Sequence, residues 1–265
     1  IFAPVLAPYG EEEVLIGKEE GIKRRQAPCI HLLGCPEDQP QHIMGLDGNV
    51  RDVYSRILYG ARVSLRVGLQ TVTVAILFGV SLGAISGYAG GWLDNLIMRL
   101  MDIVLAFPFL LLAIAIVFVL GPGLSNAMLA IAIVSIPGYA RLTRSTVLTI
   151  REAEYVEASR ALGASSFQLL FQRILPNALP PLIVLATLGI ATAILDTAAL
   201  SFLGLGAQPP QAEWGTMLGS ERNQLFSAPH LVIIPGIAIS ITVLAFNLLG
   251  DGLRDALDPR STRHV

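Results

Sequence analysis

The sequence predicts an all-α integral membrane protein, and both its composition and the arrangement of its apolar residues support this fold class. Of the 265 residues, 53% are hydrophobic and only 14% are charged, whereas ordinary soluble domains carry about 25% charged residues. The mean hydropathy is +0.64. Apolar residues gather in four long stretches, 67–93, 103–140, 174–212 and 223–250, and only the third holds a charge. Since about 20 apolar residues in a helix cross the hydrocarbon core of a bilayer, each stretch is long enough to span one.

Five spans are expected, because Gly121-Pro122-Gly123 divides the second stretch in two. Each span must be a helix, since an open strand edge inside lipid leaves backbone groups unpaired. The alternating pattern of a transmembrane β-barrel is missing from these stretches. The spans are predicted near 67–89, 103–120, 124–140, 180–203 and 231–250.

The first nine residues are mostly apolar and begin without a Met or a basic flank. A secretory signal peptide has a positive start and a small-residue cleavage site, and neither is visible here. We therefore expect residues 1–9 to be the end of a first transmembrane helix, which would make six spans in all.

Residues 10–66 are predicted to be an extracytoplasmic segment, in which 51–59 form an amphipathic helix on the membrane surface. The polar part of this segment either contacts a partner or is a plain surface loop. It contains both cysteines, and an oxidising compartment favours a disulfide between Cys29 and Cys35. No metal site is expected there, because only His31 could add a third ligand.

The arginines near the span ends predict the orientation. Nine of them fall on one side of a five-span chain and only Arg222 on the other, so we expect the first side to be cytoplasmic. This side holds the loop 141–179 and a tail, 251–265, that includes the C-terminus. Four arginines before the first span disagree, since they would lie outside: Arg51, Arg56, Arg62 and Arg66. The nine on the cytoplasmic side are Arg99, Arg141, Arg144, Arg151, Arg160, Arg173, Arg254, Arg260 and Arg263.

The loop 141–179 is predicted to fold as two helices joined by an elbow. Its Ala, Leu and Glu residues favour a first helix, Gly163 is placed to end it in a left-handed conformation, and Ser165 or Ser166 can cap a second helix. A plain connector between spans is the alternative. In the second helix, four residues at helical spacing predict one apolar stripe: Phe167, Leu170, Phe171 and Ile174.

This loop resembles the EAA loop of ABC-importer permeases, in which Glu-Ala-Ala precedes a Gly and a later Ile-x-Leu-Pro. The matching residues are Glu157-Ala158-Ser159, Gly163 and Leu175-Pro176. Ser159 departs from the second Ala of the pattern, and Arg173 stands at the Ile position. Further segments extend the similarity over about residues 43–260 to the C-type permease of dipeptide and oligopeptide importers: Gly60–Leu65, Leu175–Pro181, Leu200–Gly206, Gln208–Pro210, Trp214–Gly215 and Gly250–Pro259.

The resemblance implies the type I ABC-importer (MetI-like) transmembrane fold, with 67–250 as the permease domain, in the cell inner (plasma) membrane. It implies an ATP-driven importer of di- or oligopeptides, with nickel or glutathione as alternative substrates. The implied partners are a second homologous permease, two ATP-binding subunits that hold ATP and Mg²⁺, and an extracytoplasmic substrate-binding protein. The coupling helix that meets an ATP-binding subunit would be Glu157, Ala158, Ser159, Arg160, Ala161, Leu162 and Gly163.

No catalytic or cofactor-binding residue is expected in this chain itself. The sequence contains no glycine-rich phosphate loop, and it lacks the basic excess of nucleic-acid-binding proteins. A stand-alone channel or secondary transporter is the alternative from another class. Such a protein would be expected to show intramembrane charges or interrupted helices at repeat-related positions, whereas this sequence has one membrane acid and no visible inverted repeat.

That acid, Asp196, is costly inside a span and is therefore a candidate functional residue. It would face the translocation pathway, or else pin helices together by bonding to Thr192, Thr197 or the partner permease. The resembling family commonly has Glu at this place. A second feature of the spans is a row of small residues at spacing four, Gly79, Gly83 and Gly87, which predicts close helix packing within the subunit or against the second permease.

Overall fold

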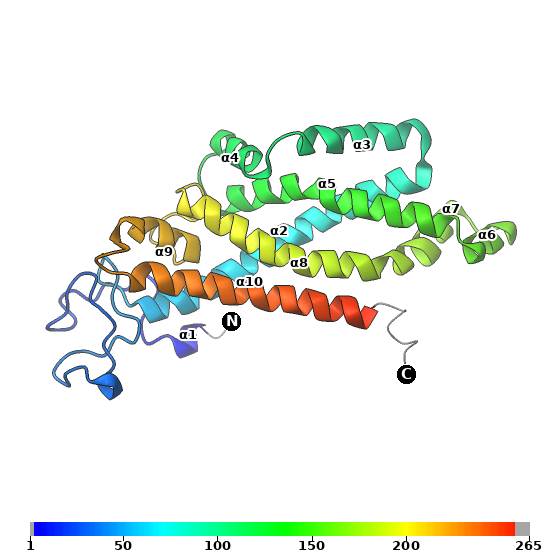
Figure 1. The fold of residues 1–265 in the computed structure, drawn as a ribbon. Helices are drawn as coiled ribbons and strands as arrows, with labels where there is room; N and C mark the ends of the chain where they lie inside the picture. Colours follow the sequence, from blue (N-terminus) through cyan, green and yellow to red (C-terminus); the bar gives the residue numbers. More distant parts are fainter. Residues whose placement is uncertain (1–2, 258–265) are drawn as a thin grey trace. The chain divides into compact units, whose positions relative to one another are not determined.

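In a computed structural model, the chain is helical from Val53 onward, apart from short connections (Figure 1). The structure describes residues 3–257, and these contain no β-strand. The predictions that involve residues 1–2 and 258–265, among them Arg260, Arg263 and the ends of the segments 250–259 and 251–265, lie outside the described residues. The elements are α1 (Ala3–Leu6), η1 (His31–Leu33), α2 (Val53–Ala89), α3 (Gly91–Leu105), α4 (Phe109–Leu120), α5 (Leu124–Arg151), α6 (Glu154–Ala161), α7 (Ser166–Gln168), η2 (Leu169–Ile174), α8 (Leu175–Phe202), α9 (Trp214–Glu221), η3 (Arg222–Gln224) and α10 (His230–Leu257).

Four helical segments are long and apolar enough to cross a membrane: α2, α5, the run from Ser166 through α8, and α10. The pair α3 and α4 passes the same test jointly, which gives up to five spans among residues 3–257. The predicted all-α membrane fold is confirmed.

The prediction of one unbroken span over 103–120 is wrong. The segment is broken between Leu105 and Phe109, and its two helices meet at 90°. The cause is Pro108, whose ring disfavours helical backbone at Phe107 and which cannot donate a backbone hydrogen bond.

The helices α2, α5, α8 and α10 all extend beyond the spans predicted from the sequence, and the largest differences are in α2 and α5. The separate surface helix predicted over 51–59 is wrong, because residues from Val53 form the first turns of α2, and Arg56 there is buried rather than solvated. No proline separates these turns from the apolar part of α2, so the helix continues. Likewise α5 does not end at residue 140 but runs on to Arg151, since charge alone does not stop a helix.

The described chain divides into two compact units. The first unit comprises residues up to Gly68, Ile116–Met128 and Ile194–Val243. Its core surrounds Trp214, which packs against Gly60 and donates a 3.1 Å hydrogen bond from Nε1 to the Ile57 carbonyl oxygen. The other buried members of this core are Val53, Ala198, Met217, Ala228, Leu231 and Ile239.

The second unit comprises Leu69–Ala115, Leu129–Ala193 and the segment from Leu244. Here α2 packs closely on α5 through the predicted row of glycines. A Cβ at Gly79 would lie 2.5 Å from the Tyr139 Cβ, and one at Gly87 would lie 2.9 Å from the Arg144 carbonyl oxygen. The expectation that these glycines pack within the subunit is therefore confirmed.

Candidate functional site

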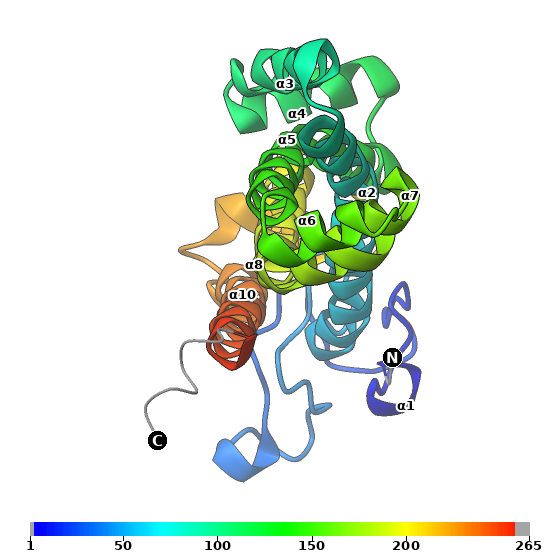
Figure 2. The same cartoon turned by 90° about the vertical axis from the view of Figure 1, so that its right-hand side faces the viewer.

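The predicted helix–elbow–helix is present between α5 and α8, and in Figure 2 its helices α6 and α7 face the viewer. The first helix, α6, ends at Ala161. Gly163, two residues later, has φ +86° and donates its N–H to the Arg160 carbonyl oxygen at 3.0 Å. A left-handed backbone conformation adds no steric strain for glycine, whereas it costs other residues about 1 kcal/mol or more of free energy. The next helix begins with a capping box, in which Ser165 and Gln168 bond each other's backbone N–H.

The apolar stripe predicted after the elbow is confirmed for Leu170 and Ile174, which pack in one core, and wrong for Phe167 and Phe171. Residues Leu169–Ile174 form π-helix, so residues five apart share a face. Leu169 and Ile174 are therefore buried, whereas Phe167 and Phe171 are 66% and 50% exposed. The two phenylalanine rings pack against each other with centroids 4.5 Å apart.

A small core fixes the elbow, by which we mean residues 154–168, to the preceding helix α5. Val156 of α6 is fully buried against Val147 of α5, together with Leu169 and Ile174, and Tyr88 at the end of α2 packs on the same cluster. The elbow is thus seated on a packed base and is not a loose connector.

The outer side of the elbow is exposed and carries unpaired charge. Leu162 at its tip is 89% exposed, and Glu157 and Arg160 are exposed as well. Neither charge forms a hydrogen bond or an ion pair within residues 3–257. A hollow of about 280 Å³ lies beside the tip, lined by Ser159, Leu162, Gly163, Ala164, Gln168, Gln172 and Arg173. Such a rigid, partly apolar projection has the properties of a docking element.

Asp196 lies in α8 and is half-buried. The alternative in which Asp196 bonds to Thr192 or Thr197 is wrong. The Thr192 hydroxyl donates to the Gly189 carbonyl oxygen at 3.0 Å, and the Thr197 hydroxyl has no partner. Among the described residues no hydrogen bond or ion pair reaches the Asp196 carboxylate.

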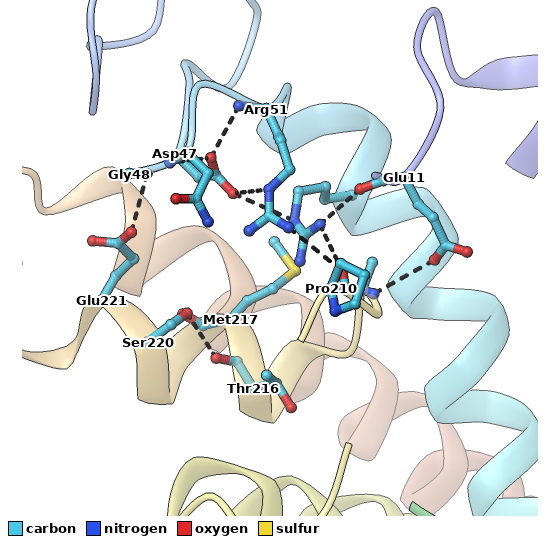
Figure 3. A network of polar contacts seen from close by, with 12 residues as sticks. Glu11, Asp47, Gly48, Arg51, Pro210, Thr216, Met217, Ser220 and Glu221 are labelled. Carbon is cyan, nitrogen blue, oxygen red and sulfur yellow. Dashed lines mark hydrogen bonds and ion pairs between the residues drawn. The ribbon is translucent and has the colours of Figure 1, made fainter. Parts of the chain in front are cut away.

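A polar network joins the N-terminal segment to α9 within the first unit (Figure 3). Asp47 accepts hydrogen bonds from the Arg51 backbone N–H at 2.9 Å and from its Nε at 2.8 Å. Glu221 accepts from the Gly48 N–H at 3.0 Å and from Arg25 Nε at 2.9 Å. These bonds hold residues 47–51 against the helix that carries Glu221.

The buried Arg56 extends this network to two carbonyl groups. Its guanidinium donates to the Glu11 carbonyl oxygen at 2.7 Å and to the Pro210 carbonyl oxygen at 3.2 Å, and it lies 3.6 Å from the Asp47 carboxylate. The network was not predicted from the sequence. Its one local signal is the spacing of four between Asp47 and Arg51, because the other partners are distant in the chain.

The predicted disulfide between Cys29 and Cys35 is present. His31, which lies between them, bonds through Nε2 to the Gln39 carbonyl oxygen at 2.8 Å. The bridge closes a small loop around η1, and Leu32 within that loop is 96% exposed.

His42 is the buried ionisable centre of the N-terminal segment. Its ring nitrogens lie 3.1 Å from Asp52 Oδ1 and 3.0 Å from Glu19 Oε2. Burial by itself lowers the pKa of His42, but the hydrogen bonds and charges of Asp52 and Glu19 outweigh it, so the pKa is raised. The Tyr9 hydroxyl donates to Glu19 at 2.6 Å, and burial together with this contact raises the pKa of Tyr9.

With this geometry established, comparison with known proteins shows clear relatives. Residues 79–263 match the family described as binding-protein-dependent transport system inner membrane component. The dipeptide transport system permease protein DppC of Alkalihalophilus pseudofirmus is 56% identical over 260 residues, which are 98% of this chain and 81% of that protein. The glutathione transport system permease protein GsiD of Escherichia coli is 50% identical over 260 residues, with the same coverage of 98% and 81%.

Among solved structures, a chain of the inward-facing MetNI methionine ABC transporter resembles this fold with a TM-score of 0.63. The match covers 76% of the present chain and 96% of that chain at 22% sequence identity. At this identity the likeness concerns the fold.

Proposed function

Because this chain belongs to the family of binding-protein-dependent transport system inner membrane components, we propose that it is the permease subunit of an ATP-driven importer for di- or oligopeptides. Its fold is that of the MetI-like type I ABC importers, as the resemblance of the sequence implied. It is a multi-pass membrane protein, and family membership favours the importer over a stand-alone channel or secondary transporter.

The observation that carries the proposal is the elbow at 154–168. A projection that transmits force needs a rigid base and an accessible tip, and here Val156 is buried in a packed core while Leu162 is 89% exposed. In the proposed assembly, residues 157–163 fit a cleft of an ATP-binding subunit. The exposed Glu157 and Arg160 pair there with charges of that subunit.

The other partners follow from the proposed class of transporter. A second permease completes the membrane pore, two ATP-binding subunits hold ATP and Mg²⁺, and an extracytoplasmic protein delivers the substrate. This chain itself binds no nucleotide. Its elbow and C-terminus lie in the cytoplasm, and the disulfide-containing segment before α2 lies outside, where a disulfide persists.

Asp196 is assigned to a contact beyond this chain. Its carboxylate has no partner within residues 3–257, and an unpaired acid inside a span is costly. In the assembly it meets the partner permease or the amine of a passing peptide. An Asp196→Asn variant that lowers import but not assembly would support the pathway assignment, whereas loss of the permease pair on purification would support the interface.

Di- or oligopeptide is the substrate class we propose, and glutathione is the second candidate, since a glutathione permease is also 50% identical to this chain. Nickel is a third candidate, implied by the resemblance of the sequence alone. Competition of labelled dipeptide uptake by unlabelled dipeptide, glutathione and Ni²⁺, with the cognate binding protein present, distinguishes the three.

The test of the coupling role uses the transporter co-purified from its own operon and placed in nanodiscs. Leu162→Glu is expected to reduce co-purified ATP-binding subunit about tenfold, because it puts a charge into the apolar centre of the contact. Leu32→Glu is the matched control, since this leucine is similarly exposed but lies in the N-terminal segment. Uptake by the purified chain without ATP-binding subunits would contradict the proposal.

A further inference from the structure

The C-terminal part of α5 is fastened to the end of α2 at three successive levels in the second unit. A Cβ at Gly83 would overlap the Ala140 carbonyl oxygen, and one at Gly87 would lie 3.0 Å from Val147. One turn further, Arg151 donates from Nη1 to the carbonyl oxygens of Gly87 and Tyr88, both at 3.2 Å. These carbonyls are among the last of α2, which lack partners within their own helix. The two helix ends therefore form one rigid piece.

The first turn of α3 is held to the same piece by charge. Arg144 of α5 makes two parallel hydrogen bonds to Asp94, from Nε to Oδ1 and from a terminal nitrogen to Oδ2, both at 2.6 Å. Ser86 of α2 donates a further hydrogen bond to Asp94. The side chains of Asp94 and Arg144 are only 13% and 34% exposed. A bidentate, partly buried pair of this kind is strong and fixes orientation as well as distance.

A second ion pair joins the same two helices further along. Arg141 of α5 lies 2.6 Å from Asp102, which is two turns beyond Asp94 on α3. This pair is about half exposed in the chain alone. With two pairs on α3, one near each end, rotation of α3 relative to α5 would break at least one of them.

The elbow rests on the same piece. Val156 of α6 packs on Val147, which is also the residue that contacts Gly87 of α2, and Tyr88 borders the cluster. The ends of α2 and α5, the first turn of α3 and the base of α6 thus share their contacts, without a flexible layer between them.

We infer that Asp94 and Arg144 are positioning residues for energy coupling, which fasten α3 to the end of α5 so that a displacement of α6 moves α3 as well. This inference rests on the proposed function, in which α6 receives the movement of an ATP-binding subunit. In this arrangement the ion pair between Asp94 and Arg144 transmits the movement of α5 to α3, although 50 positions separate the two residues along the chain. At its far end α3 meets the break before Phe109, where α4 turns away by 90° and the movement of α3 can be taken up.

The functional test compares ATP hydrolysis and peptide import in the same proteoliposomes. In Asp94→Asn the carboxylate is lost but the shape is kept, so the complex is expected to retain peptide-stimulated ATP hydrolysis within about twofold while import per ATP falls about tenfold. The exchanged pair Asp94→Arg with Arg144→Asp places opposite charges at the two positions again and is expected to recover at least about half of the wild-type import per ATP.

Glu13→Gln is the matched control, since it removes a local, exposed ion pair with Lys18 in the first unit. It is expected to leave the import per ATP hydrolysed unchanged. The inference would be overturned if Asp94→Asn left the import per ATP hydrolysed unchanged. It would also be overturned if the exchanged pair recovered none of the import that Asp94→Asn loses. Failure of the wild-type complex to couple hydrolysis to import would instead contradict the proposed function, and the inference with it.

A distance measurement keeps the inference testable even where Asp94→Asn does not assemble. Both native cysteines are bonded to each other, so spin labels at Leu100→Cys on α3 and Glu154→Cys on α6 are specific. In the otherwise native complex the distance between them should stay within about 2 Å when ATP is added, because the two helices belong to one rigid body. A larger change would overturn the inference. In Asp94→Asn the distance is expected to change with ATP, and a constant distance there would show that the ion pair is not needed.

Discussion

At the scale of single residues, Gly163 shows how one backbone position sets the elbow. Its φ of +86° is needed there, yet no atom lies within 4 Å of a Cβ built on it, so a substitution acts through the backbone alone. We predict that Gly163→Val destabilises the elbow by about 1–2 kcal/mol, whereas Gly163→Asn costs less because Asn tolerates the left-handed region.

Peptide-stimulated ATP hydrolysis of the two variants in nanodiscs tests this order. Gly163→Val should lose more of the stimulation than Gly163→Asn, and the two variants should assemble to the same extent. Equal loss in both variants would show that the side chain is excluded by a partner, and not that the backbone is strained.

His42 makes a second prediction at this scale, concerning pH. Its folded pKa is raised by Asp52 and Glu19, and the Tyr9 hydroxyl faces the same Glu19. A raised pKa stabilises the fold fully below the unfolded value of about 6.5, and this stabilisation is lost as the pH rises through the folded pKa. The midpoint of thermal unfolding in the wild-type chain should therefore fall over that interval.

The His42→Gln variant should lack this part of the pH dependence, whereas His31→Gln, which alters a histidine bonded only to the Gln39 carbonyl oxygen, should retain it. Unfolding is followed by tryptophan fluorescence, because Trp214 reports on the first unit. Identical pH profiles for His42→Gln and the wild type would contradict the assignment.

At the scale of elements, the packing of α2 on α5 depends on the absence of side chains. Gly83→Leu would force the helices apart at the Ala140 carbonyl oxygen and at Thr143, whose Cβ would be 2.7 Å from the first added atom. We predict a loss of about 1–3 kcal/mol, the usual cost of overpacking. Gly138→Ala on α5 meets no atom within 4 Å and is the control, with an expected change of zero or a slight gain. Thermal unfolding of the two variants in one detergent measures both effects.

The α3–α4 pair and the segment after the elbow show, at the same scale, where sequence periodicity is insufficient. The span over 103–120 was predicted from an apolar run of normal span length, without regard to Pro108 within it. After the elbow, a helix of regular pitch would have buried Phe171 together with Ile174, whereas the π-helix buries Leu169 together with Ile174. A change of helix type has no reliable local signal, because it is selected by the core against which the residues pack.

At the scale of the whole molecule, the orientation proposed from the arginines can be tested directly. Single cysteines at Ile16 and at Leu162 would both be accessible, because these side chains are 58% and 89% exposed. With the proposed orientation, a membrane-impermeant maleimide added to intact cells or spheroplasts labels Ile16→Cys but labels Leu162→Cys only after the membrane is opened. The reverse pattern would invert the orientation and exclude the elbow as a cytoplasmic coupling element.

The sequence by itself determined those features that depend on local chemistry. The apolar stretches require membrane helices, Gly163 and Ser165 specify the elbow, and Cys29 with Cys35 lie close enough along the chain to pair. In each case the residues that make the feature are within one helix or one short loop, so composition and spacing suffice.

Only the tertiary structure decided which distant side chains meet. Asp94 and Arg144 are 50 positions apart, and Arg56 reaches the Pro210 carbonyl oxygen across 154 positions. In the sequence, Arg144 and Arg56 counted only as positive charges for predicting the orientation in the membrane. Their partners follow from how the helices pack, because a buried charge is stable only where folding brings an opposite charge or a free carbonyl group beside it.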